Sequence, residues 1–246
     1  LKQQLQTNLL AMVRQLPAND GVGVLGLPVY NSPDSLESEA FRTLRTALAF
    51  TNTDLSCVAV SSSEPGDGKT TVLANLGVSF SQVGKRTLMI DADLRRPGLT
   101  NLFALRGKPG LSDVLRSNSD LATVATSCTR TTEADNLHIL PSGSRPLDPT
   151  GLLVSDRFSE LLAWAQANYD QVLIDSAPLL AVSDASIVGK VADGLMLVIQ
   201  PEKNHRRHVL RTVEEVRSAG ISLIGIVVNR VSPDSNQHYY GGYGYG

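Results

Sequence analysis

Short apolar runs alternate with amphipathic stretches along most of the chain, beginning at residue 57. The apolar runs predict strands at residues 57–60, 87–90, 137–140, 172–174, 195–199 and 223–228. Helical spacing predicts helices at residues 35–49, 69–82, 155–167, 183–191 and 205–219, with residues 110–116 and 120–126 helical or irregular. This alternation favours an α/β fold with a doubly wound, mostly parallel sheet and helices on both faces. Ligands in such folds bind beyond the carboxyl ends of the strands.

The two ends of the chain depart from this pattern. Leu5, Leu9, Met12 and Leu16 predict a short helix, and a Gly- and Pro-rich stretch follows at residues 17–33. We interpret residues 1–34 as a linker and lead-in, residues 35–231 as the folded domain, and residues 232–246 as a flexible tail. Because the first residue is Leu rather than Met, we expect a fragment of a longer polypeptide.

Composition narrows the classes of protein that fit. The 246 residues carry a net charge of −2 and are 42% hydrophobic, which excludes wholesale disorder and gives no reason to expect a nucleic-acid partner. Two cysteines are too few for a disulfide framework, so we expect a reducing compartment. No run approaches the roughly 18 apolar residues of a membrane span. Four of the six tyrosines fall in the last eight residues: Tyr239, Tyr240, Tyr243 and Tyr245.

A phosphate-binding loop is predicted between the first strand and the second helix. Residues 63–71 read Ser-Glu-Pro-Gly-Asp-Gly-Lys-Thr-Thr, although the strict pattern has Gly where Ser63 stands. Glycines let backbone N–H groups approach phosphate oxygens, and the helix N-terminus adds its positive end. The predicted contacts to a nucleotide come from Glu64, Pro65, Gly66, Asp67, Gly68, Lys69, Thr70 and Thr71.

Carboxylates follow two later strands, where they would lie near this loop. Asp91 and Asp93 follow the second strand and would share a face if that strand continued, whereas Asp175 follows the fourth strand. Thr70, Asp91 and Asp175 are therefore candidate ligands of Mg²⁺. Asn229 ends the last strand, where an asparagine contacts the purine in the P-loop proteins that this chain resembles; the alternative is a simple turn residue.

These motifs resemble the cytoplasmic kinase domain of the bacterial tyrosine kinases (BY-kinases) of exopolysaccharide and capsule co-polymerases. The loop matches that family's Walker A motif, residues 89–97 (Met-Ile-Asp-Ala-Asp-Leu-Arg-Arg-Pro) its Walker A′ motif, and residues 173–178 (Leu-Ile-Asp-Ser-Ala-Pro) its Walker B motif. The resemblance implies ATP and Mg²⁺, and autophosphorylation of the C-terminal tyrosines. It also implies a ring-shaped homo-oligomer, an octamer in the family, whose interface uses a Glu-x-x-Arg-x-x-Arg motif, here Glu39, Arg42 and Arg45.

The same resemblance implies a place at the inner membrane of a bacterium. Residues 1–34 would be juxtamembrane, a transmembrane activator domain would lie on the same or a separate chain, and a tyrosine phosphatase would oppose the kinase. Phosphoryl transfer depends on positioning and charge neutralisation. Lys69 would offset the charge of the transferring group, with Asp91 as first and Asp93 as second candidate for the base.

Two alternatives belong to other classes. One is a partitioning or septum-site type P-loop ATPase, although those proteins carry a lysine where this chain has Glu64. The other is a non-catalytic nucleotide-binding module that assembles a polysaccharide export machine. A basic cluster at residues 203–211 is either a solvated helix face or a binding site for a phosphate, a membrane or an acidic partner.

Overall fold

The computed structural model describes residues 7–17, 21–51 and 55–232, so the four C-terminal tyrosines lie outside the described residues. In chain order, the elements are β1 (Leu9–Arg14), η1 (Gly23–Gly26), α2 (Pro28–Asn31), α3 (Leu36–Ala49), β2 (Cys57–Ser62), α4 (Lys69–Ser81), β3 (Thr87–Asp91), α5 (Gly98–Leu102), α6 (Leu111–Arg116), α7 (Leu121–Cys128), β4 (Arg130–Thr131), β5 (Leu137–Leu140), α8 (Pro149–Val154), α9 (Asp156–Asn168), β6 (Gln171–Asp175), α10 (Asp184–Val191), β7 (Gly194–Ile199), α11 (Arg206–Ser218) and β8 (Leu223–Val231). Within these ranges, no helix is both long and apolar enough to cross a bilayer.

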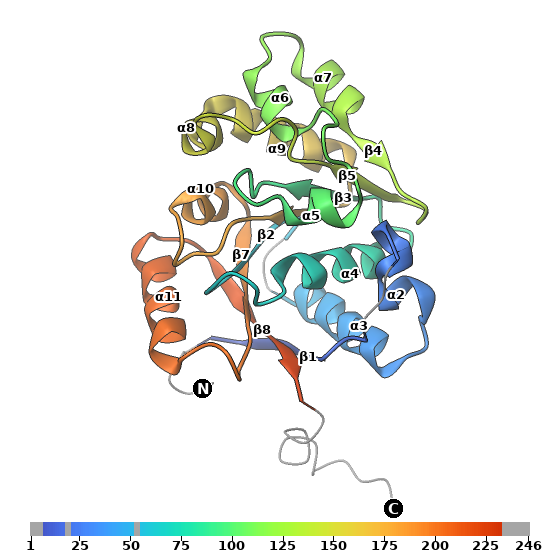
Figure 1. Cartoon of the computed structure of the whole chain (residues 1–246), viewed down its shortest axis with the longest axis vertical. Helices are drawn as coiled ribbons and strands as arrows, with labels where there is room; N and C mark the ends of the chain where they lie inside the picture. The colour runs from blue at the N-terminus through green and yellow to red at the C-terminus, as the bar shows by residue number, and fades with distance from the viewer. Residues whose placement is uncertain (1–6, 18–20, 52–54, 233–246) are drawn as a thin grey trace, which may run out of the picture.

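One twisted sheet runs through the molecule in the order β1-β8-β7-β2-β6-β3-β5-β4 (Figure 1). Every neighbouring pair is parallel except β4 and β5. Helices α2, α3 and α4 cover one face, and α6 to α11 cover the other (Figure 1). The doubly wound, mostly parallel α/β fold predicted from the sequence is therefore confirmed.

Alternate strand residues feed two separate cores, because successive side chains of a strand point to opposite faces. Ala59 packs with the α6–α11 side, whereas its neighbours Val58 and Val60 pack with α3 and α4. Val209, Val213 and Val216 share one buried stripe of α11 at helical spacing. Helices thus cover both faces of the sheet, so polar groups are found at the edge formed by the carboxyl ends of its strands.

The predicted helix near the N-terminus is wrong, because residues 9–14 form β1. Its backbone pairs in parallel with β8, from Leu9 opposite Ile226 to Arg14 opposite Val231. The uninterrupted run Leu-Leu-Ala-Met-Val fits a strand, and Val13 is fully buried against the α3 side of the sheet. Part of the segment interpreted as a linker therefore belongs to the core of the domain.

Helix α3 begins where the sequence predicts. The Ser35 hydroxyl accepts a hydrogen bond from the backbone N–H of Ser38 at 3.2 Å, which satisfies one of the free donors of the first turn. Phe41, Leu44 and Leu48 are buried on one face. The short helices α2, α5 and α8 and the two-residue strand β4 have no predicted counterpart, since four to six residues are too few to show a period.

Candidate active site

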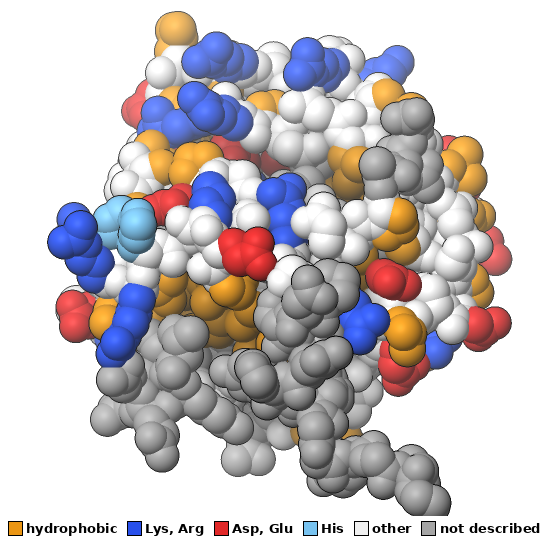
Figure 2. Space-filling model, turned by 60° about the horizontal axis from the view of Figure 1, so that its bottom comes forward, with side chains coloured by type: hydrophobic (Ala, Val, Ile, Leu, Met, Phe, Trp, Pro, Cys, Tyr) orange, Lys and Arg blue, Asp and Glu red, His pale blue; other side chains and the backbone are white. Residues whose placement is uncertain are grey.

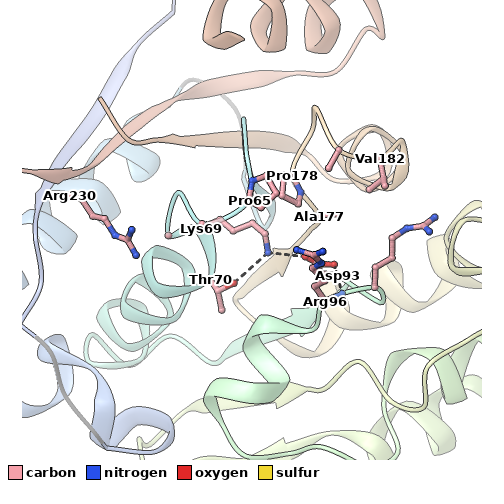
Figure 3. A pocket seen from close by; sticks show the side chains of 13 residues that line it. Pro65, Lys69, Thr70, Asp93, Arg96, Ala177, Pro178, Val182 and Arg230 are labelled. Atoms are coloured by element: carbon pink, nitrogen blue, oxygen red, sulfur yellow. Dashed lines mark hydrogen bonds and ion pairs between the residues drawn. The ribbon is translucent and has the colours of Figure 1, made fainter. Parts of the chain in front are cut away.

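A cavity of about 480 Å³ opens at the carboxyl ends of β2, β3 and β6. Its lining comes from the loop before α4 (Pro65, Gly66, Gly68, Lys69, Thr70), the segment after β3 (Asp93, Arg95, Arg96), the segment after β6 (Ala177, Pro178, Ala181, Val182) and Arg230 of β8. Figure 3 shows Lys69 between Thr70 and Asp93, with Arg230 and Val182 on opposite sides. This is the edge of the sheet where ligands of α/β folds bind.

The loop before α4 depends on glycine at two positions. Gly66 and Gly68 have φ angles of 85° and 91°, which side chains with a Cβ atom rarely adopt. A Cβ atom on Gly68 would lie 2.1 Å from Nδ2 of Asn229, and that amide donates a hydrogen bond to the Asp67 carbonyl at 2.8 Å. The loop is thus closely packed against the end of β8, directly before the N-terminus of α4.

Ser63 occupies the position where the strict phosphate-loop pattern has glycine. Its side chain is fully buried, and among the described residues its hydroxyl oxygen is a buried polar atom without a hydrogen-bond partner. A buried hydroxyl without a partner is costly, but Ser63 does not line the cavity. The narrow glycine turn and the start of α4 are what fit a phosphate-binding cradle.

Lys69 lies at the centre of a buried charge cluster. Its Nζ atom is 3.0 Å from Oδ1 of Asp175, 3.2 Å from Oδ2 of Asp93 and 3.4 Å from Oγ1 of Thr70. The Thr70 hydroxyl donates to the other Asp175 oxygen at 2.6 Å. Four of the residues predicted from the sequence (Lys69, Thr70, Asp93 and Asp175) are therefore brought together in one network at the base of the cavity.

Asp91 and Asp93 have different surroundings. Strand β3 ends at Asp91, so the alternation that would have placed both carboxylates on one face does not apply. Oδ2 of Asp91 accepts hydrogen bonds from the backbone N–H and the hydroxyl of Thr100, each at 2.7 Å, and Oδ1 accepts from the Asp93 N–H at 3.3 Å. Asp93 lines the cavity, whereas Asp91 is enclosed behind it.

Burial and charge act against each other in this cluster. Burial and then the charge of neighbouring Asp175 raise the pKa of Asp91 to about 7. Burial also raises the pKa of Asp175, although the Lys69 ammonium opposes the shift. For Lys69, burial disfavours the charged form, but the carboxylates of Asp175 and Asp93 outweigh it and raise the pKa. Lys69 therefore stays protonated, and its positive charge offsets the buried carboxylates of Asp175 and Asp93.

Other predicted contact residues point away from the cavity. The Asp67 carboxylate is fully buried and accepts the Glu64 N–H at 2.8 Å, so that N–H is not available to a phosphate. The side chains of Glu64 and Asp67 face the segment before α11, and Thr71 is exposed on the first turn of α4. Asn229 lies directly behind Gly68. The cradle therefore consists of the loop after Glu64.

The predicted oligomer motif lies on α3, away from the cavity. Arg42 bonds to Glu39 of the same helix at 2.8 Å and to the Pro33 carbonyl at 2.6 Å. Arg45 is half-buried and donates to the carbonyl and hydroxyl oxygens of Ser79 in α4. Burial lowers the pKa of Arg45, followed by the charge of Arg42. Arg45 thus joins α3 to α4 within the chain, while Glu39 is exposed.

Sequence reasoning missed three arginines of the cavity. Arg95 and Arg96 come two and three residues after Asp93, so their place after a strand was a usable signal. Arg95 is held by the buried Asp184 at 2.7 Å, which leaves Arg96 on the same wall. Arg230 has a φ angle of 56°, which is uncommon for a residue other than glycine, and no sequence pattern predicts it.

The donor set fits Mg²⁺ in the manner of phosphate loops. Within the described ranges, no three His, Cys, Asp or Glu side chains are grouped as metal ligands. Mg²⁺ is usually held through one or two protein oxygens together with phosphates and water, so a large acidic cluster is not needed. Thr70 on the first turn of α4 and Asp175 at the end of β6 supply such oxygens, which lie 2.6 Å apart.

Comparison with known proteins agrees with this geometry. The AAA domain family model matches residues 55–222, which include the loop and both acidic strand ends. The chain therefore belongs to that class of P-loop nucleotide-binding proteins.

Relatives with substantial sequence identity define the family within that class. The chain is 39% identical over 213 residues to tyrosine-protein kinase YwqD of Bacillus subtilis, covering 85% of this chain and 88% of YwqD. It is 38% identical to tyrosine-protein kinase wzc of Salmonella typhimurium, covering 81% of this chain but 28% of that protein. The kinase domain of Escherichia coli tyrosine kinase ETK superposes with a TM-score of 0.83 at 28% identity, covering 99% of this chain and 97% of that domain. The chain belongs to the bacterial tyrosine kinases.

The alternative ATPase class is less similar. The Pyrococcus furiosus cell division ATPase MinD has a TM-score of 0.58 at 26% identity and covers 74% of this chain and 78% of MinD. The likeness supports the shared P-loop fold, but the closer matches are protein-tyrosine kinases. Family and fold together make this chain a protein-tyrosine kinase that uses ATP.

Proposed function

We propose that this chain transfers the γ-phosphoryl group of ATP to tyrosines of its own C-terminal tail, Tyr239, Tyr240, Tyr243 and Tyr245. The observation that carries the proposal is the network of Lys69, Thr70, Asp93 and Asp175 at the base of an open cavity. It combines a cation for the phosphates, oxygen ligands for a metal and a carboxylate facing the space where an acceptor would enter.

Each residue of the network has a task in phosphoryl transfer. The backbone of residues 65–69 and the start of α4 hold the phosphates, and Lys69 offsets the charge that develops on the transferring group. Thr70 and Asp175 would hold Mg²⁺, and Asp91 accepts the backbone N–H of Asp93 and so helps to position that residue. Mg²⁺ supplies charge neutralisation of the phosphates when bound.

Asp93 is our candidate for the proton acceptor, in preference to Asp91. A tyrosine hydroxyl has a pKa of about 10 and is a poor nucleophile at neutral pH, so a carboxylate must accept its proton as the new bond forms. Asp93 lines the cavity, and Asp91 has both carboxylate oxygens engaged by Thr100 and the Asp93 backbone. Once ATP engages Lys69, the Asp93 carboxylate would lose its cation and be free to accept a hydrogen bond from the tyrosine hydroxyl.

We further propose that phosphorylation occurs in trans within a ring-shaped homo-oligomer built through Glu39 and Arg42 on α3. A tethered tail has a high effective concentration at a neighbouring site. Four phosphotyrosines would add roughly −6 to −8 charges, which outweighs the chain's net charge of −2 and would loosen the ring.

The setting proposed for the kinase is the inner membrane of a bacterium, where it would regulate exopolysaccharide or capsule synthesis. A transmembrane activator on the same or a separate chain and a tyrosine phosphatase would control it. The same-chain and separate-chain arrangements correspond to relatives of different length, because the match covers 88% of YwqD but only 28% of wzc.

Mass spectrometry of the purified chain before and after incubation with ATP and Mg²⁺ tests the proposal. We expect phosphate on the four tail tyrosines, none in Lys69→Met, and strongly reduced labelling in Asp93→Asn. Mixing Lys69→Met with an active protein whose four tail tyrosines are Phe separates trans from cis labelling. Hydrolysis of ATP without any tyrosine phosphate would refute the kinase assignment, and an unlabelled tail in the mixture would refute transfer in trans.

A further inference from the structure

The phosphate loop is held from outside by the segment that joins β7 to α11. The Lys203 ammonium lies 2.7 Å from Oδ1 of the buried Asp67 and also donates to the Pro65 carbonyl. The Asn204 amide donates to the same Asp67 oxygen at 3.0 Å, and its own carbonyl oxygen accepts the Gln200 N–H at 2.7 Å. Two side chains from residues 136 or more positions away thus bind the middle of the loop.

A second set of bonds holds the start of the loop. Nδ1 of His208, on the first turn of α11, lies 2.6 Å from Oε1 of Glu64, and the Asn204 amide reaches Oε2 of Glu64 at 3.2 Å. The hydrogen bond from His208 lowers the pKa of Glu64, which keeps this side chain an anion. At the left of Figure 2, histidine side chains lie beside both acidic and basic ones.

The contacts of Lys203, Asn204 and His208 offset the negative charge of two acidic residues in the phosphate loop. Glu64 and Asp67 bring two carboxylates into a loop that is meant to bind phosphates, and a buried carboxylate without a partner is unfavourable. Lys203 pairs with Asp67, and His208 and Asn204 engage Glu64, so both acids turn away from the cavity. Neither acid lines it, while Pro65, Gly66 and Gly68 do.

We propose that Lys203, Asn204 and His208 are positioning residues that hold the phosphate loop in its nucleotide-binding shape. The proposal rests on the proposed kinase function and gives a role to part of the basic cluster at residues 203–211. It assigns that role by contact rather than by overall charge. Arg207 is exposed and Arg211 pairs with Glu215 on the same helix at 2.8 Å.

Charge-matched variants of the full chain test the proposal. Lys203→Gln and Arg207→Gln each remove one positive charge from adjacent turns, but only Lys203 contacts the loop. We expect Lys203→Gln to weaken the equilibrium binding of ATP with Mg²⁺ about tenfold or more, measured by calorimetry, because a hydrogen bond to a buried charge is lost. Arg207→Gln should bind ATP within about twofold of the parent, and Lys203→Arg should recover most of the affinity. In kinase assays, the loss should appear in KM for ATP more than in kcat.

His208 provides an independent pair of variants if Lys203→Gln does not fold. His208→Asn keeps a donor near the position of Nδ1, whereas His208→Leu removes it, so only the Leu variant should lose ATP affinity. Equal affinity in Lys203→Gln and Arg207→Gln, or in the two His208 variants, would overturn the proposal. Because ATP binding is measured directly, a parent protein that binds ATP but labels no tyrosine would refute the proposed function and leave this inference standing.

Discussion

Gly68→Ala is the sharpest test of the phosphate-loop geometry. At φ of 91°, an alanine is strained, at about 1–2 kcal/mol for a left-handed residue. Its Cβ atom would also lie 2.1 Å from Nδ2 of Asn229, and such overlap in a packed interior typically destabilises by about 1–3 kcal/mol. The sum is a loss of about 2–5 kcal/mol in the free energy of unfolding.

Gly84 offers a matched control in the turn after α4. Its φ angle is 81°, but a Cβ atom there meets nothing within 4 Å. Gly84→Ala should therefore lower the free energy of unfolding only by the cost of the left-handed backbone, about 1–2 kcal/mol. Urea unfolding gives the free energy of unfolding of Gly68→Ala and of Gly84→Ala, and the difference between these two values measures the clash with Asn229. In an Asn229→Ala background, the extra loss of Gly68→Ala should shrink, since the clashing amide is gone.

The same variants separate stability from function. ATP binding should weaken strongly in Gly68→Ala, because the loop must shift where it meets phosphate, and should stay near the parent value in Gly84→Ala. If Gly68→Ala is no less stable than Gly84→Ala and binds ATP normally, the close packing of β8 behind the loop is refuted.

Three further predictions concern the rest of the fold. The pKa of Asp91 is raised from 3.8 to about 7 by burial and then by Asp175, so the folded protein retains a proton that the unfolded chain releases. Stability without nucleotide should therefore fall as the pH rises from about 4 to about 7, and urea titrations of Asp91→Asn should show a flatter profile. Burial raises the pKa of the Cys57 thiol to about 12, so iodoacetamide should label Cys57 only after unfolding. Labelling of Cys57 in the native protein, located by mass spectrometry, would contradict this. Val13→Asp should lower the free energy of unfolding by at least about 3 kcal/mol, because it removes a buried valine and buries a carboxylate. Leu9→Asp, at a position 40% exposed on the same strand, should lose far less in the same denaturation assay.

The sequence was sufficient for those parts of the site that depend on local pattern. A glycine-rich turn between a buried strand and a helix allows few conformations, so the local pattern alone predicts the places of Lys69 and Thr70. Asp175 follows an apolar run that had to be a central strand, because parallel strands are covered on both faces. In the structure, its backbone pairs beside β2 and β3 at the same edge.

The features that were missed depend on where elements end and on distant contacts. Asp91 and Asp93 differ because β3 stops at Asp91, and strand ends are not visible in an apolar pattern. Residues 9–14 showed a helical spacing, but pairing with β8, more than 200 residues later in the chain, decided their conformation. The contact of Lys203 with Asp67 spans 136 positions and leaves no local trace.

The difference from the partitioning ATPases at Glu64 now has a physical explanation within this chain. A lysine at that position would add a cation beside the phosphates, whereas a glutamate there would repel them if it faced the cavity. Here the glutamate is held by His208 and Asn204, and its N–H is already used by Asp67. The loop therefore depends on Lys69 for its cation, and Lys69 is paired with two carboxylates until a nucleotide competes for it. Nucleotide binding and release of Asp93 to act on a tyrosine would thus be one coupled event.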